Sequence, residues 1–115
     1  MTNGVTIDIA FSTRAVRSLC QSSEAIERKY GAEVARALIS RLADVRASSS
    51  IAELSSVVPL STDGEKGNVT IQVSGEIVSY IHASENHRIS PRLADGNVDW
   101  ARVTRVQIRK VEVRK

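Results

Sequence analysis

The stretch NVTIQVSGEIVSYIH, residues 68–82, decides the fold class of this chain. Apolar and polar residues alternate from Val69 to Val73, which indicates a strand with one buried face. Ser74 and Gly75 follow and are typical of a hairpin turn. Residues 77–82 can form the returning strand. The stretch therefore predicts two antiparallel neighbours within one sheet.

The downstream segment ARVTRVQIRKVEVRK, residues 101–115, has the valine and isoleucine content of a further strand. It carries six basic residues against the single acid Glu112, although the whole chain has a formal net charge of only +3. A basic strand face suits a polyanion, and the phosphate backbone of a nucleic acid is the commonest one. The alternative is a solvated edge strand whose charges block aggregation.

The apolar residues of this last strand do not keep one phase. Val103 shares the outward phase of Arg105 and Arg109, whereas the residues that need burial are Val106, Ile108, Val111 and Val113. Strict alternation cannot bury all four of them. We therefore expect a β-bulge near Arg109-Lys110, or a tail that leaves the sheet.

Upstream of the hairpin, the sequence predicts one strand and then helices. Residues 5–11 alternate as a strand does, and residues 32–47 have helical spacing. Between them, Ser12 or Thr13 can cap a first helix, and Ser23 can cap a second, short one.

The longest helix, over residues 32–47, is expected to begin after Gly31 and to bury one apolar stripe. The residues of this stripe are Val34, Ala35, Leu38, Ile39, Leu42 and Val45. Arg41 falls elsewhere and is assigned to a solvated face. Ser50 can cap one further turn, and a loop with Pro59 and a turn at 62–67 leads to the hairpin.

This order of elements predicts a single α+β domain over residues 1–115. An N-terminal strand and two to three helices precede a mainly antiparallel sheet, with the helices packed on one face. The other face is then open and can carry the arginines.

Composition excludes several classes of protein. The one cysteine, Cys20, allows neither an intrachain disulfide nor a cysteine-based zinc site. Aromatic residues make up 3% of the chain, which argues against platforms that stack several bases. No metal constellation or cofactor motif is present. No apolar run approaches a membrane span and no leader pattern is present, so we expect a cytoplasmic protein.

Three segments resemble the RelE/HigB superfamily of bacterial toxins, often called plasmid maintenance killer proteins. They are ERKYGAEVARALISRLADVRASSSIAEL at 27–54, LSTDGEKGNVTIQVSGE at 60–76 and DGNVDWARVTRVQI at 95–108. The resemblance implies the RelE-like fold and the toxin of a type II toxin–antitoxin system. It also implies a metal-free endoribonuclease that cuts mRNA on the ribosome. A protein antitoxin, in many cases with a helix-turn-helix domain, would neutralise it.

The chain departs from that family at two places. Many relatives have an arginine near the position of Val78, and many end in Asp-any-His where this chain has Val113-Arg114-Lys115. Some relatives work without histidine, using Lys, Arg and Tyr. The alternative is a catalytically degenerate protein of the same fold that binds an antitoxin or RNA without cleaving it. A plain nucleic-acid-binding module is a third interpretation.

Basic residues and histidines supply the candidate site. The catalytic candidates are Arg109, Arg114, Lys115 and His82. The candidates for RNA binding are Lys66, Arg105, Lys110, His87 and Arg88. The histidines can exchange protons near neutral pH, and the cations can hold a scissile phosphate. For each of them the alternative is a structural histidine or a solvated surface charge.

Overall fold

The computed structural model describes residues 6–73 and 77–114, and this part of the chain forms four α-helices and a five-stranded sheet. The elements in chain order are β1 (Asp8–Phe11), α1 (Arg14–Cys20), α2 (Ser23–Tyr30), α3 (Ala32–Ala47), α4 (Ile51–Ser55), β2 (Leu60–Asp63), β3 (Asn68–Val73), β4 (Val78–Glu85), the 3-10 helix η1 (Trp100–Arg102) and β5 (Arg105–Arg114).

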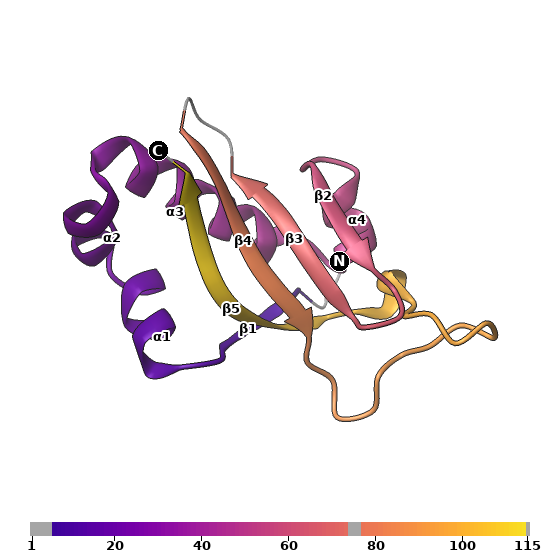
Figure 1. The fold of residues 1–115 in the computed structure, drawn as a ribbon. Helices are drawn as coiled ribbons and strands as arrows, with labels where there is room; N and C mark the ends of the chain where they lie inside the picture. Colours follow the sequence, from indigo (N-terminus) through magenta and orange to yellow (C-terminus); the bar gives the residue numbers. More distant parts are fainter. Residues whose placement is uncertain (1–5, 74–76, 115) are drawn as a thin grey trace, which may run out of the picture.

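The strand order is β1-β5-β4-β3-β2, and every neighbouring pair is antiparallel except β1 and β5, which are parallel. Figure 1 shows α3 and α4 behind the sheet, while the face of β3, β4 and β5 toward the viewer is open. The α+β fold predicted from the sequence is therefore confirmed. The predicted turn at Ser74-Gly75 lies outside the described residues. No helix in the described ranges is long and apolar enough to cross a membrane.

Short polar residues start three of the four helices. Thr13 caps α1 by accepting a hydrogen bond from the Val16 backbone N–H at 3.1 Å, so Thr13 and not Ser12 is the cap. Ser22 caps α2 in place of the predicted Ser23. The backbone decides both positions, because Thr13 and Ser22 are the extended residues directly before the helical ones. Ser50 caps α4 as predicted.

Gly31 separates α2 from α3, with a φ of 94° that glycine adopts without strain. The bounds of α3 agree with the prediction, but two of its residues do not. Ile39 is 40% exposed, whereas Arg41 is buried and its Nε donates a hydrogen bond to the Gln72 carbonyl at 2.8 Å. The buried face of α3 thus includes Arg41, which ties the helix to β3.

The apolar core lies between the sheet and the helices. Most inward side chains of the three central strands are buried, and they include Val69, Ile71, Ile81, Val106 and Ile108. Each such side chain contributes roughly 1.5–3 kcal/mol through burial. The inward set therefore fixes which side chains of β3, β4 and β5 point to the open face.

β2 is a strand where the sequence suggested a loop. Its residues, LSTD, are exposed except for half-buried Leu60, so no alternation identifies it. The pairing of Leu60 with Ile71 and of Asp63 with Asn68 makes it a strand. Gly67, with a φ of 77°, closes the tight turn to β3 and donates to the Asp63 carbonyl at 2.7 Å.

The last strand contains the predicted bulge. His82 pairs with Lys110 and Ala83 pairs with Ile108, so Arg109 is an extra residue on β5. The bulge leaves both Arg109 and Lys110 exposed and returns Val111 to the buried phase.

Residue Ser12 fastens the bulge from the other end of the chain. Its backbone N–H donates to the Ile108 carbonyl at 2.9 Å, and its hydroxyl donates to the Arg109 carbonyl at 3.2 Å. The junction of β1 and α1 thus fixes the backbone at the bulge.

Residues 86–99 form a long loop that the core holds at one end. Val98 and Val103 are buried, and Trp100 packs against the core. Val103 was expected to point outward, but it precedes β5, so the alternation of that strand does not apply to it. Nη1 of Arg92 donates to the Gly64 carbonyl at 3.1 Å and attaches the loop to the β2–β3 turn.

Candidate functional site

The open face of the sheet is polar. Its outward side chains include Thr70 and Gln72 on β3, Tyr80 and His82 on β4, and Gln107, Arg109, Lys110, Glu112 and Arg114 on β5. Each of them is half-buried or exposed. Because the opposite face holds the apolar core, this one is available to a polar ligand.

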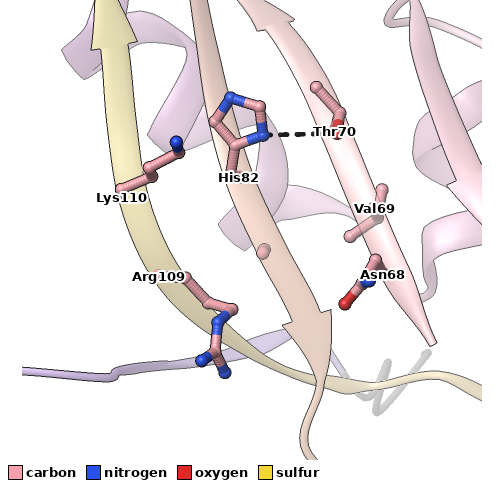
Figure 2. Close-up of a pocket in the computed structure, with 7 residues that line it drawn as sticks. Asn68, Val69, Thr70, His82, Arg109 and Lys110 are labelled. Carbon is pink, nitrogen blue, oxygen red and sulfur yellow. Dashed lines mark hydrogen bonds between the residues drawn. The ribbon is translucent and has the colours of Figure 1, made fainter. Parts of the chain in front are cut away.

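A hollow of about 410 Å³ lies on this face, over the middle of β3, β4 and β5. The pairing register sets Thr70, His82 and Lys110 side by side across the three strands. Arg109 and Asn68 complete the polar part of the lining, as Figure 2 shows. The hollow therefore joins one histidine, two cations and two uncharged polar groups.

The bulge supplies the second cation. In a regular strand, side chains that follow each other point to opposite faces. At the bulge Arg109 and Lys110 are both exposed and line the same hollow. Two adjacent residues can therefore bring two positive charges to one anion, which regular alternation would not allow.

The ring of His82 is held from both of its nitrogens. Nε2 lies 2.7 Å from Oε1 of Glu112, and Nδ1 lies 3.4 Å from the hydroxyl of Thr70. The other oxygen of Glu112 accepts a hydrogen bond from Nε of Arg114 at 2.7 Å. A single carboxylate thus connects the histidine and the arginine.

The ionised carboxylate of Glu112 determines which nitrogen of the His82 ring carries the proton. The Arg114 guanidinium, and after it the His82 imidazole, hold the pKa of Glu112 below its usual range, and Glu112 in turn raises the pKa of Arg114. An ionised carboxylate only accepts hydrogen bonds, so Nε2 of His82 must carry the proton. In the neutral ring, Nδ1 is then the acceptor. It lies on the side of Thr70, which lines the hollow.

This arrangement can perform proton transfer beside a bound anion. A carboxylate that fixes the tautomer and orientation of an imidazole prepares the other nitrogen as a general base, or as a general acid when protonated. Arg109 and Lys110 can neutralise the charge of a phosphate in the same hollow.

Three predicted RNA-binding residues lie apart from this hollow. His87, Arg88 and Arg105 line a second hollow of about 490 Å³, where Asp8 and the start of β5 meet the 86–88 segment. The Thr104 backbone N–H donates to Nε2 of His87 at 3.0 Å, so that histidine holds the loop to the chain before β5. Nε of Arg105 lies 4.0 Å from a carboxylate oxygen of Asp8.

The remaining candidates take other positions. Lys66 is exposed in the β2–β3 turn, and its backbone N–H donates to Asp63 at 3.1 Å. Arg114 contacts Glu112, and its guanidinium carbon lies 5.2 Å from the centre of the Tyr80 ring. Lys115 lies outside the described residues. Val78, where the family resemblance expects an arginine, is 44% exposed at the start of β4.

Sequence reasoning missed Glu112, Thr70 and Tyr80 as members of the site. Glu112 entered only as the one acid of a basic segment. The signal that could have found it is the bulge itself, because the shift of phase after Arg109 moves Glu112 to the face of His82.

Within residues 6–73 and 77–114, no three His, Cys, Asp or Glu side chains gather as a metal site would require. Comparisons with protein-family models, with curated proteins and with solved structures find no match to this chain.

Proposed function

We propose that this protein is the toxin of a type II toxin–antitoxin module and acts as a metal-free, ribosome-dependent endoribonuclease that inhibits translation. The observation that carries the proposal is the position of His82. Glu112 orients its ring, and two cations of the bulge face the same hollow on the open side of the sheet.

The chemistry uses the substrate's own nucleophile. The ribose 2′-hydroxyl attacks the neighbouring phosphorus, a 2′-oxygen–phosphorus bond forms, and the bond to the 5′-oxygen breaks. Nδ1 of His82 takes the proton of the 2′-hydroxyl, and the departing 5′-oxygen takes a proton from water. Since the nucleophile is the 2′-hydroxyl, the reaction is restricted to RNA.

Arg109 and Lys110 bind the scissile phosphate in this proposal. Charge builds on the non-bridging oxygens as the phosphorus becomes five-coordinate, and cations positioned in advance stabilise that charge. Arg114 is a catalytic candidate from the sequence, and in the structure its Nε donates a hydrogen bond to Glu112. We assign it to holding Glu112 and, through Glu112, His82. Lys115 stays a candidate from the sequence.

The partners follow from the family resemblance. We propose a cognate protein antitoxin encoded beside this chain, of the kind that in many cases has a helix-turn-helix domain, and the ribosome with its mRNA as target. The place of action is then the cytoplasm.

One observation favours a second function, in which the protein binds RNA or its antitoxin without cleavage. Val78 presents an exposed apolar side chain where many relatives of the resembled family have an arginine. In that case Arg109 and Lys110 would still bind phosphate. The protein would lack the arginine that many relatives have at the position of Val78, and it would not cleave the RNA.

The experiment adds the purified protein to a cell-free translation reaction and maps mRNA ends by primer extension. His82→Gln and the pair Arg109→Ala/Lys110→Ala test the site, and Arg36→Ala on the exposed face of α3 is the matched control. We expect new ribosome-dependent ends from the wild type and from the control, and none from the site variants. Intact mRNA with the wild-type protein would favour the binding function.

A further inference from the structure

A smaller hollow of about 210 Å³ adjoins the candidate site on the same face. It is lined by Pro59, Leu60, Ser61, Thr70, Gln72 and Tyr80. Thr70 lines both hollows, so the two lie next to each other on β3 and β4.

The lining of the smaller hollow has a chemistry of its own. None of the described residues that line it has a charged side chain, in contrast to the larger hollow with its two cations. Tyr80 contributes an aromatic ring and Pro59 an apolar one. Ser61 and Gln72 contribute a hydroxyl and an amide that make no side-chain hydrogen bond to any other described residue. Such a lining suits a flat, uncharged ring with donors and acceptors on its edge.

Tyr80 is positioned to stack on such a ring. It lies on β4, between Glu112 on β5 and Gln72 on β3. Arg114 approaches it from β5, with the guanidinium 5.2 Å from the ring centre, and Glu112 fixes that guanidinium at 2.7 Å. The hollow lies toward β3 and β2, on the other side of Tyr80. Arg114 thus contacts the Tyr80 ring from the side of β5, and the side of the ring toward β3 is open to a ligand.

We propose that this hollow binds a nucleobase adjacent to the phosphate that Arg109 and Lys110 hold. The inference rests on the proposed function and adds to it a subsite that reads the substrate. Tyr80 supplies the stacking surface, and the Gln72 amide and Ser61 hydroxyl meet the edge of the base. The scarcity of aromatic residues excludes a platform for several bases, but one tyrosine is sufficient for one base.

The test compares two ligands with the full-length protein. One is a short single-stranded oligoadenosine with 2′-fluoro sugars, which cannot be cleaved through a 2′-hydroxyl. The other is the same sugar–phosphate chain without bases. Fluorescence anisotropy gives Kd for the wild type, Tyr80→Ala, Tyr80→Phe, Gln72→Ala and Lys110→Ala.

We expect Tyr80→Ala to weaken binding of the oligoadenosine about tenfold, as the loss of one base–aromatic stack does, and to leave binding of the baseless chain unchanged. Tyr80→Phe should retain wild-type affinity because the ring remains. Gln72→Ala should weaken only the ligand that carries bases. Lys110→Ala should weaken both ligands alike.

Two results would contradict the nucleobase subsite, and they lead to different conclusions about RNA binding. If Lys110→Ala weakens both ligands while Tyr80→Ala weakens neither, or both equally, the RNA site remains and the base subsite is wrong. If the wild type binds neither ligand, the subsite and RNA binding by the free protein fall together. Circular dichroism of Tyr80→Ala shows whether the variant is folded, and Gln72→Ala tests the same hollow with the ring in place.

Discussion

His82 and Glu112 are joined by a contact of 2.7 Å between Nε2 and Oε1, across 30 residues of sequence and from neighbouring antiparallel strands. The second oxygen of the same carboxylate binds Arg114. Glu112 is the one acidic residue of β5, and it orients the only histidine among the described residues that line the main hollow.

Glu112→Gln should lower the free energy of unfolding at neutral pH and lose that effect in acid. The Arg114 guanidinium and then His82 depress the pKa of Glu112 in the folded protein. A depressed carboxylate contributes stability above its unfolded pKa, and this stability is lost as the pH falls through the folded pKa. Urea unfolding from neutral pH to about pH 2 measures the difference between wild type and variant. Glu27→Gln on exposed α2 is the control, and a difference that is constant with pH would contradict the linkage.

Arg109→Ala and Lys110→Ala should each reduce the salt dependence of RNA binding. Every phosphate contact to a single strand contributes about 0.7 to the slope of log K against log salt concentration. Each variant should therefore lower the slope by about that amount, and Arg36→Ala should leave it unchanged. Anisotropy titrations at several salt concentrations give the slopes. A lower affinity with an unchanged slope would show that the two side chains do not contact phosphate.

Deletion of Arg109 should leave the protein folded and weaken its binding of RNA. Without the extra residue, Ile108 and Val111 stay inward with Lys110 between them, so β5 becomes a regular strand. The loss of the Ser12 hydrogen bond costs about 1 kcal/mol. Deletion of Gln107 is the contrasting variant, because it moves Val106 out of the buried phase. Thermal unfolding compares the two, and an equal loss of stability would refute the assignment of the bulge.

Val78→Arg should strengthen RNA binding, and should raise cleavage if the protein is a nuclease. The new arginine would stand opposite Arg114 on β5, and like charges directly opposite destabilise a sheet by about 0.5 kcal/mol. Val57→Arg adds the same charge at a side chain that is 73% exposed after α4, and serves as control. Kd and the yield of mRNA ends are the measurements. Equal gains from both variants would mean that only net charge matters.

His87→Ala should destabilise the protein without changing RNA affinity. The substitution removes the acceptor of the Thr104 N–H, and an unpaired, partly buried donor costs roughly 1–2 kcal/mol. Arg88→Ala, one residue further, should leave stability unchanged because Arg88 is exposed. Urea unfolding and anisotropy separate the two effects. A loss of RNA affinity with full stability would restore His87 as a contact residue.

Features set by local sequence could be predicted. The bounds of α3, its start at Gly31 and the Ser50 cap follow from helical spacing and capping chemistry. The bulge was predictable because four apolar residues of one strand could not share a phase. Thr13 was one of two candidates for the cap of α1, and the predicted cap of α2 was one residue off, since serine and threonine occur in adjacent positions and only the backbone selects between them.

Features set by pairing between distant strands could not be predicted. β2 has no alternation and exists because β3 offers it partners. The sequence gives the face of His82 but not its register against β5, so Glu112 was not recognised as its partner. Six of the candidates therefore separate into two hollows, Lys66 and Arg114 line neither of them, and His87 forms a hydrogen bond with the Thr104 backbone.

The hydrogen bond from Ser12 to Arg109 joins residues 97 positions apart and has a consequence for the order of events during synthesis. Among the described strands β1 pairs only with β5. It therefore has no strand partner until β5 has been synthesised. The bulge, both of its cations and Glu112 lie on β5 as well. Contacts this distant along the chain form late in folding. A nascent chain in which β5 has not yet been made therefore has no assembled site, and under the proposed function such a chain cannot cut RNA.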